Sequence, residues 1–201
     1  PRARSAEDLA LALDVVAGPD RFRSSGWRLV LPPPKARTLR GLRVAIWPKE
    51  DVAPTSVEIS DRVQDIGDAL ARAGAIVSDR ARPGISPGQS HDTYLSLLGA
   101  AGLAGLPDDY YAESQRAAAR LDADDASPLA VLTRARVMDH RRWSDHDEAR
   151  TRDRLRWRAF FDDWDVVISP ISATTAYAHD HRPKLERVLA VDTVRTSHYE
   201  H

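Results

Sequence analysis

Hydrophobic and polar residues follow one another along the chain with two periods, one typical of helices and the other of buried strands. The first period occupies residues 5–17, where a serine stands at the start and Gly18-Pro19 follow the end. The apolar residues that share one helical face there are Ala6, Leu9, Leu13 and Val16. We therefore expect a helix over 5–17. Residues 20–41 lack sustained periodicity and contain three consecutive prolines, which predicts a linker or a surface excursion.

A strand, a helix and a second strand come next. The apolar run LRVAIW at 42–47 ends at Pro48, as buried strands often do. An amphipathic segment predicts a helix over 56–73, and AIVSD predicts a strand over 75–79. Such a unit folds as one crossover with two adjacent parallel strands. DVVISP, at 165–170, predicts a third strand of the same sheet.

The rest of the pattern is mostly helical. Residues 90–164 predict an apolar helix, a short helix near 108–120 and a long helix over 128–164 that begins after Ser127. RVLAV, at 187–191, has a weaker strand pattern. We expect an α/β fold, a layered sheet with helices on both faces that this sequence leaves incomplete.

Composition narrows the classes of partner. The 201 residues include 29 basic and 30 acidic side chains, for a formal net charge of −1, so no strong field favours nucleic acid. No apolar run approaches the roughly 20 residues of a membrane span, and we expect no membrane partner. The chain has no cysteine, which excludes disulfides and thiolate ligands and is compatible with the cytoplasmic location that we expect.

Two long stretches carry a pattern that belongs to a known family. They are ARSAEDLALALDVVAGPD at 3–20 and HRRWSDHDEARTRDRLRWRAFFDDWDVVISPISATTAYAHDH at 140–181. The first resembles the segment that follows the nucleophile loop of amidase signature hydrolases, and the second resembles their long helix, next strand and proline-containing loop. GLRVAIWP and DALARAGAIV are consistent with the middle of the family. The resemblance implies a small-molecule amide substrate and no cofactor.

The same resemblance implies that the catalytic machinery lies outside the sequence. In the family, the nucleophilic serine, its partner serine, the lysine and the glycine-rich oxyanion turn all precede the segment that resembles 3–20. We therefore expect 1–201 to be one partial amidase-like domain, an internal fragment without the catalytic segment, in which the family's C-terminal part is missing or replaced after about Pro183. An incomplete sheet would expose an edge through which chains could self-associate.

Two other functions compete with this interpretation. The alternative is a noncatalytic truncated paralogue that acts as a binding or interaction module. A reading frame that continues upstream into a glycine-serine loop would favour the enzyme. A nucleotide-binding protein is disfavoured, because no glycine-rich loop follows 42–47.

RSSGW, at 23–27, is a false candidate for the nucleophile loop. Arg23 and Trp27 flank Ser24 and Ser25, and such bulky flanks would not let several backbone amides converge on one oxygen. A polar turn is the favoured interpretation. The lysines stand in predicted loops, where nothing would desolvate an amine and lower its pKa, and no catalytic residue is assigned. They are Lys35, Lys49 and Lys184.

Histidines offer poor metal sites. His179 and His181 flank Asp180, but no third ligand stands at a suitable spacing, so a polar loop is favoured over a metal. His140 and His146 would point in different directions from one helix.

The remaining candidates lie on the long helix and in the loop after the third strand. The polar centre of one helical stripe would either line a pocket or, as we favour, lie exposed among ion pairs. Its residues are Arg142, His146 and Asp153. In the loop SPISATTA at 169–176, Ser172 and Thr174 are the substrate-binding candidates, although capping and turn roles fit equally well.

Overall fold

The computed structural model describes residues 3–34, 36–50, 53–102, 105–182 and 187–197. The chain divides into two compact units, residues 1–37 and residues 38–201. The first unit contains α1 (Ala6–Val16), which confirms the predicted helix. It begins there because the Ser5 hydroxyl accepts a hydrogen bond from the Asp8 N–H at 3.0 Å.

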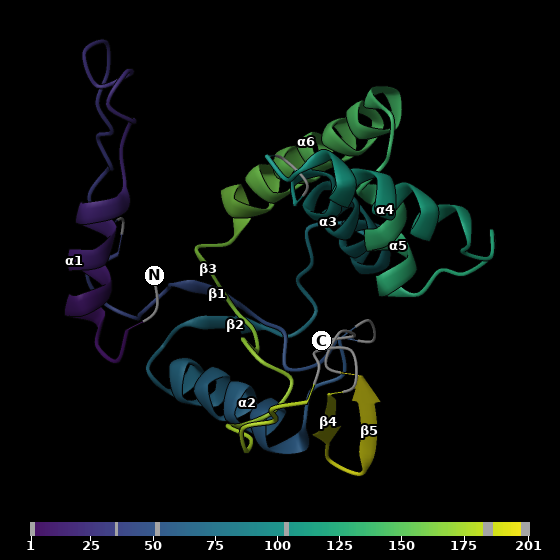
Figure 1. Ribbon diagram of the computed structural model, residues 1–201. Coiled ribbons are helices and arrows are strands. Elements are labelled where there is room, and N and C mark those ends of the chain that lie inside the picture. Colours follow the sequence, from purple (N-terminus) through teal and green to yellow (C-terminus); the bar gives the residue numbers. More distant parts are fainter. Residues whose placement is uncertain (1–2, 35, 51–52, 103–104, 183–186, 198–201) are drawn as a thin grey trace. The chain divides into compact units, whose positions relative to one another are not determined.

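The second unit contains a small parallel sheet (Figure 1). Its strands are β1 (Arg43–Ile46), β2 (Ile76–Ser78) and β3 (Val166–Ile168), in the order β2-β1-β3. Val44 lies opposite Val77 on one side and Val166 on the other. The predicted parallel crossover and the sharing of one sheet by all three segments are confirmed.

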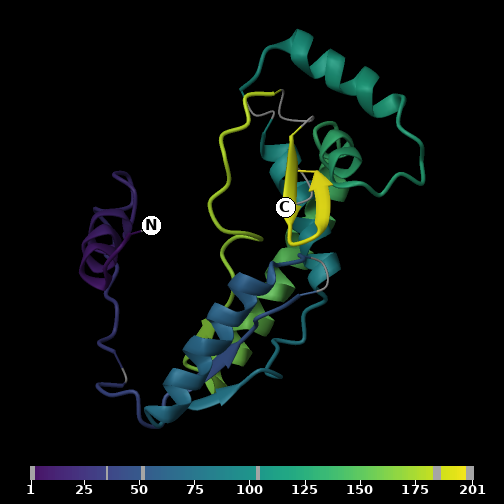
Figure 2. The ribbon, with the colours of Figure 1, turned by 90° about the horizontal axis from the view of Figure 1, so that it is seen from below.

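Helix α2 (Val57–Arg72) connects β1 to β2 and packs against the sheet, as Figures 1 and 2 both show. Val44 and Ile46 of β1 are buried against Val63 of α2. A Cβ atom at Gly67 would lie 2.6 Å from the Ile46 Cδ1, so a larger residue there would require the end of the Ile46 side chain to move. This contact is the centre of the core around the sheet.

Four further helices follow β2. They are α3 (Pro87–Ala101), α4 (Asp108–Ala119), α5 (Pro128–Ala135) and α6 (His140–Asp163). As predicted, the Ser127 hydroxyl caps α5, where it accepts a hydrogen bond from the Ala130 N–H at 3.3 Å. Within the described residues the chain thus has six helices.

The prediction of one continuous helix over 128–164 is wrong. The chain leaves the helical conformation after Ala135, and Asp139 is extended, with φ −73° and ψ 163°. The Asp139 carboxylate then accepts a hydrogen bond from the Arg142 N–H at 2.9 Å and starts α6 as a new helix. The helical spacing of the stripe that contains Met138 and Arg142 continues across the break, which is why the periodicity alone did not reveal it.

An aromatic cluster connects the end of β1 to α6. The Trp47 ring centroid lies 5.4 Å from that of Trp157 and 6.4 Å from that of Phe160. The Trp47 indole N–H donates a hydrogen bond to the carbonyl oxygen of Ala81 at 2.8 Å, which satisfies the polar end of this partly buried ring.

A hairpin completes the described part of the second unit. Its antiparallel strands are β4 (Val188–Val191), which the sequence predicted, and β5 (Val194–Ser197), which it did not. Asp192, in the turn, has φ 52°. Its carboxylate accepts a hydrogen bond from the Val57 N–H at 3.0 Å, so the turn caps the distant helix α2.

Candidate functional sites

The loop at 169–176 lies at the carboxyl edge of the parallel sheet, the edge where such sheets usually bind ligands. The Ser56 N–H, just before α2, donates a hydrogen bond to the carbonyl oxygen of Ala173 at 2.8 Å. This bond holds the loop beside the start of α2. The Ser172 side chain is exposed and that of Thr174 is half-buried, so a ligand can reach the Ser172 hydroxyl.

The start of α2 has an unusual arrangement of polar groups. Ser56 is only 5% exposed, and its hydroxyl has no hydrogen-bond partner among the described residues. The first amide of the helix is instead bound by Asp192, which is 135 positions away in sequence. Sequence reasoning missed this contact, because no local pattern relates a hairpin turn to a helix so far upstream.

RSSGW forms a hydrogen-bonded turn. The Ser24 hydroxyl donates to the carbonyl oxygen of Arg21 at 2.9 Å, and the Ser25 hydroxyl donates to that of Phe22 at 3.4 Å. Both serines therefore bond to carbonyl oxygens of their own turn, which confirms the interpretation as a polar turn. Among the lysines, Lys49 is exposed, and Lys35 and Lys184 lie outside the described residues.

The segment around His179 and His181 has its carboxylate already engaged. Arg182 donates to both oxygens of Asp180, with Nη2 2.6 Å from Oδ2 and Nε 3.0 Å from Oδ1. These hydrogen bonds lower the pKa of Asp180 to about 2. Across the described ranges, no group of three or more His, Cys, Asp or Glu side chains is placed to hold a metal ion.

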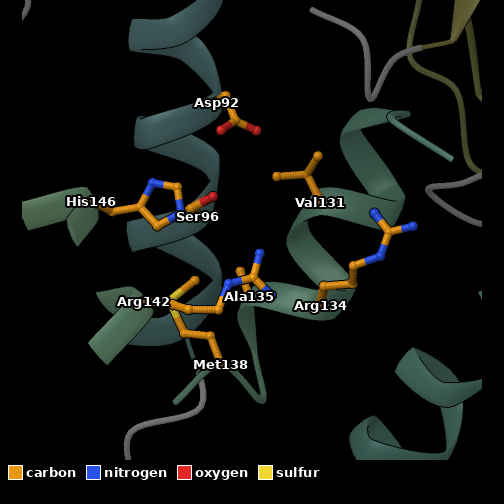
Figure 3. Close-up of a pocket in the computed structure, with 8 residues that line it drawn as sticks. All are labelled: Asp92, Ser96, Val131, Arg134, Ala135, Met138, Arg142 and His146. Carbon is orange, nitrogen blue, oxygen red and sulfur yellow. The ribbon is translucent and has the colours of Figure 1, made fainter. Parts of the chain in front are cut away.

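The polar stripe of α6 divides between two surroundings. Arg142 and His146 line a hollow of about 150 Å³, together with residues of α3 and α5 (Figure 3). Asp153 lies further along α6, where its carboxylate pairs with Arg156 at 3.1 Å. The pocket interpretation thus describes all three residues, because Asp153 lines a second hollow between α3 and α6. The ion-pair interpretation, which we favour for the whole stripe from the sequence, describes Asp153 only in part, since it pairs with Arg156 but is half-buried.

Comparison with known proteins decides the family. The family model described as Amidase matches residues 1–197, nearly the whole chain. The chain belongs to the amidase family. No curated protein matches it.

In this member of the amidase family, the serines and lysine considered as catalytic candidates can be compared with what amide hydrolysis needs. A nucleophilic serine needs a proton acceptor within hydrogen-bond reach and fixed donors around the developing oxyanion. Ser24 and Ser25 donate to backbone carbonyls, and Lys49 is exposed. No described helix of this chain is both long and apolar enough to span a bilayer.

Proposed function

We propose that the chain is part of an amidase signature hydrolase that cleaves carboxamide C–N bonds through a Ser-Ser-Lys mechanism. The observation that carries the proposal is the family match over residues 1–197. The serine, its partner serine and the lysine would lie outside the 201 residues of this sequence. The hydrogen bonds of Ser24 and Ser25 and the exposure of Lys49 support that placement, because none of these groups is activated.

In such a reaction the serine oxygen attacks the carboxamide carbon, the amine leaves with a proton, and water then hydrolyses the acyl ester. The contribution proposed for this chain is to bind the amide substrate. Ser172 and Thr174 would hydrogen-bond the amide from the carboxyl edge of the sheet. The bond between Ser56 and Ala173 supports this role, since it fixes the backbone between the two side chains.

The proposed architecture is a single amidase domain to which both units contribute, with 20–41 as a linker inside it. Its sheet would have helices on both faces. Helix α2 covers one face, and the other face carries Ile76, which is 56% exposed. The sheet would extend beyond the edges seen here, or pair with a second copy of the chain. We place the enzyme in the cytoplasm, in keeping with a sequence that has no cysteine.

Kinetics of the whole amidase that contains this chain test the proposed binding role. Thr174→Val keeps the shape of the side chain and removes its hydroxyl, so we expect a higher KM for a simple carboxamide, by roughly 5- to 10-fold, with kcat changed less. Ser172→Ala should act in the same direction. Thr175→Val, one residue further along the exposed loop, is the matched control and should leave KM unchanged. Equal KM values in all variants would contradict the role of the loop.

A noncatalytic paralogue is the second candidate, and the inactive surroundings of Ser24, Ser25 and Lys49 favour it. The coding DNA distinguishes the two functions. An upstream reading frame that encodes a lysine followed by a glycine-serine loop supports the hydrolase. A complete gene that lacks both features supports the paralogue and excludes the proposed reaction.

A further inference from the structure

The hollow between α3, α5 and α6 is separate from the loop proposed to bind the amide (Figure 3). Arg142 and His146 reach it from α6, and Asp92 and Ser96 reach it from α3. Its volume is about 150 Å³. The rest of its lining comes from α5 and the segment after it, namely Val131, Arg134, Ala135 and Met138.

Polar groups in this hollow have unused hydrogen-bonding capacity. Ser96 is only 4% exposed, and its hydroxyl has no hydrogen-bond partner among the described residues. The side chains of Asp92, Arg142 and His146 likewise form no hydrogen bond or ion pair within the described part of the chain. Asp92 and Arg142 are exposed, so the hollow presents a hydroxyl, a guanidinium and a carboxylate that are all available to one ligand.

The charge of the lining favours an anion. Arg134 donates through Nη1 to the carbonyl oxygen of Asp125 at 2.7 Å, and through Nη2 to that of Asp122. Hydrogen bonds from Ser127, and to a smaller degree the charge of Arg134, lower the pKa of Asp125, so Arg134 already has a carboxylate nearby. Arg142 is the arginine of the lining that forms no ion pair within the described residues, and it is therefore the group that suits an anion.

We propose that this hollow binds a small carboxylic acid with an amino or hydroxyl group next to the carboxylate. Arg142 presents the planar pair of donors that matches a carboxylate, and the Ser96 hydroxyl supplies another donor. The Asp92 carboxylate accepts a hydrogen bond from the amino or hydroxyl group. Val131, Ala135 and Met138 leave space for a short aliphatic end.

Size limits the ligand further. A cavity of about 150 Å³ accommodates a compact molecule of about six non-hydrogen atoms. Three-carbon acids such as L-lactate and L-alanine have this size, and longer acids would extend out of the hollow. The site is independent of amide hydrolysis, and its failure would leave the proposed amidase reaction untouched.

Nuclear magnetic resonance of the 201-residue chain provides the test. Titration with L-lactate should shift the Ser96 amide and His146 ring signals in a saturable way, and L-alanine should do the same. Propionate, which lacks the hydroxyl, and lactamide, which lacks the charge, should each bind roughly 10-fold more weakly. Shifts that rise linearly without saturation, or equal affinities for lactate and lactamide, would overturn the proposal.

Variants of the lining residues test which side chains bind L-lactate. Arg142→Gln should weaken L-lactate binding by roughly 10- to 100-fold, because a charged donor pair is lost. Asp92→Asn should remove the preference for lactate over propionate. Arg152→Gln is the matched control, since Arg152 is exposed on the same helix, pairs with Glu148 at 3.5 Å and lies outside the lining.

Unchanged binding in Arg142→Gln, or an equal loss in Arg152→Gln, would refute the assignment. Circular dichroism verifies that each variant is folded. If Arg142→Gln does not fold, Arg142→Lys takes its place, with the charge kept, the planar pair lost and roughly 10-fold weaker binding expected.

Discussion

At the scale of single residues, the structure shows which polar groups are already engaged and which are free. The sequence identified Ser24 and Ser25 as turn residues, because their bulky flanks are visible without a structure. It did not identify Asp92 or Ser96, since both depend on which face of α3 meets α5 and α6. Periodicity locates a helical face, but it does not show which neighbouring helix covers that face.

Asp180 allows a prediction about pH. Its bonds to Arg182 keep its pKa at about 2, below the ordinary value for an aspartate. Because the pKa is lower in the folded chain than in the unfolded chain, the stabilising effect is complete above about pH 4 and is lost as the pH falls towards 2. Carboxyl-carbon NMR titration should show Arg182→Gln raising the pKa of Asp180 towards about 4.

Arg187→Gln is the control for that titration. Arg187 lowers the pKa of Asp180 only through charge, as the smallest of the contributions, whereas Arg182 also donates hydrogen bonds. Its removal should therefore raise the pKa less than Arg182→Gln does. An Asp180 that already titrates near pH 4 in the unchanged chain would contradict the observed pairing.

At the scale of helices and strands, the pattern of apolar and polar residues predicted the elements whose formation depends on neighbouring residues. The crossover formed by β1, α2 and β2 follows from two apolar runs and one amphipathic segment, all visible in the sequence. Strand β5 was missed because the turn between β4 and β5 consists of Asp192-Thr193. This is not the Asn-Gly or Asp-Gly pair that usually indicates a hairpin in a sequence. The start of α6 was visible as Asp139, a good capping residue, but the continuous stripe concealed it.

Gly99 tests the packing of α3 against α5. A glycine inside a helix costs about 0.5 to 1 kcal/mol relative to alanine, so Gly99→Ala would stabilise an isolated helix. In this structure the new Cβ would lie 2.6 Å from the Ala135 Cβ and 2.8 Å from the carbonyl oxygen of Leu132. We therefore expect Gly99→Ala to lower the free energy of unfolding by about 1 to 3 kcal/mol in urea denaturation.

The double variant Gly99→Ala, Ala135→Gly provides the control for this contact. It removes one of the two close approaches and leaves the carbonyl oxygen of Leu132, so it should recover part of the lost stability. Stabilisation by Gly99→Ala alone would show that α3 and α5 are further apart than the structure places them.

At the scale of the whole molecule, the first unit carries apolar side chains that it does not bury itself. Helix α1 has no buried residue, although its sequence is that of a helix with an apolar face. Its exposed apolar side chains are Leu9, Leu11, Leu13, Val15 and Val16. Large exposed apolar patches usually mark interfaces. In a chain that matches the amidase family, such a surface suits contact with further protein, whether the rest of an amidase domain or a second copy.

Amide hydrolysis is a property of the whole molecule, because it needs a nucleophile, a base and oxyanion donors held together in one site. Loss of a single oxyanion donor slows acyl transfer by about 100-fold or more, and a nucleophile without a base reacts hardly at all. Because Ser24 and Ser25 donate to their own turn and Lys49 is exposed, we expect the chain alone to hydrolyse no simple amide above background. Endpoint assays of ammonia release measure the hydrolysis of amides by the chain. Labelling with a serine-directed acylating probe measures whether a serine of the chain is reactive. A burst of product that disappears in Ser24→Ala or Ser25→Ala would overturn it, since that burst would require RSSGW to act as a nucleophile loop.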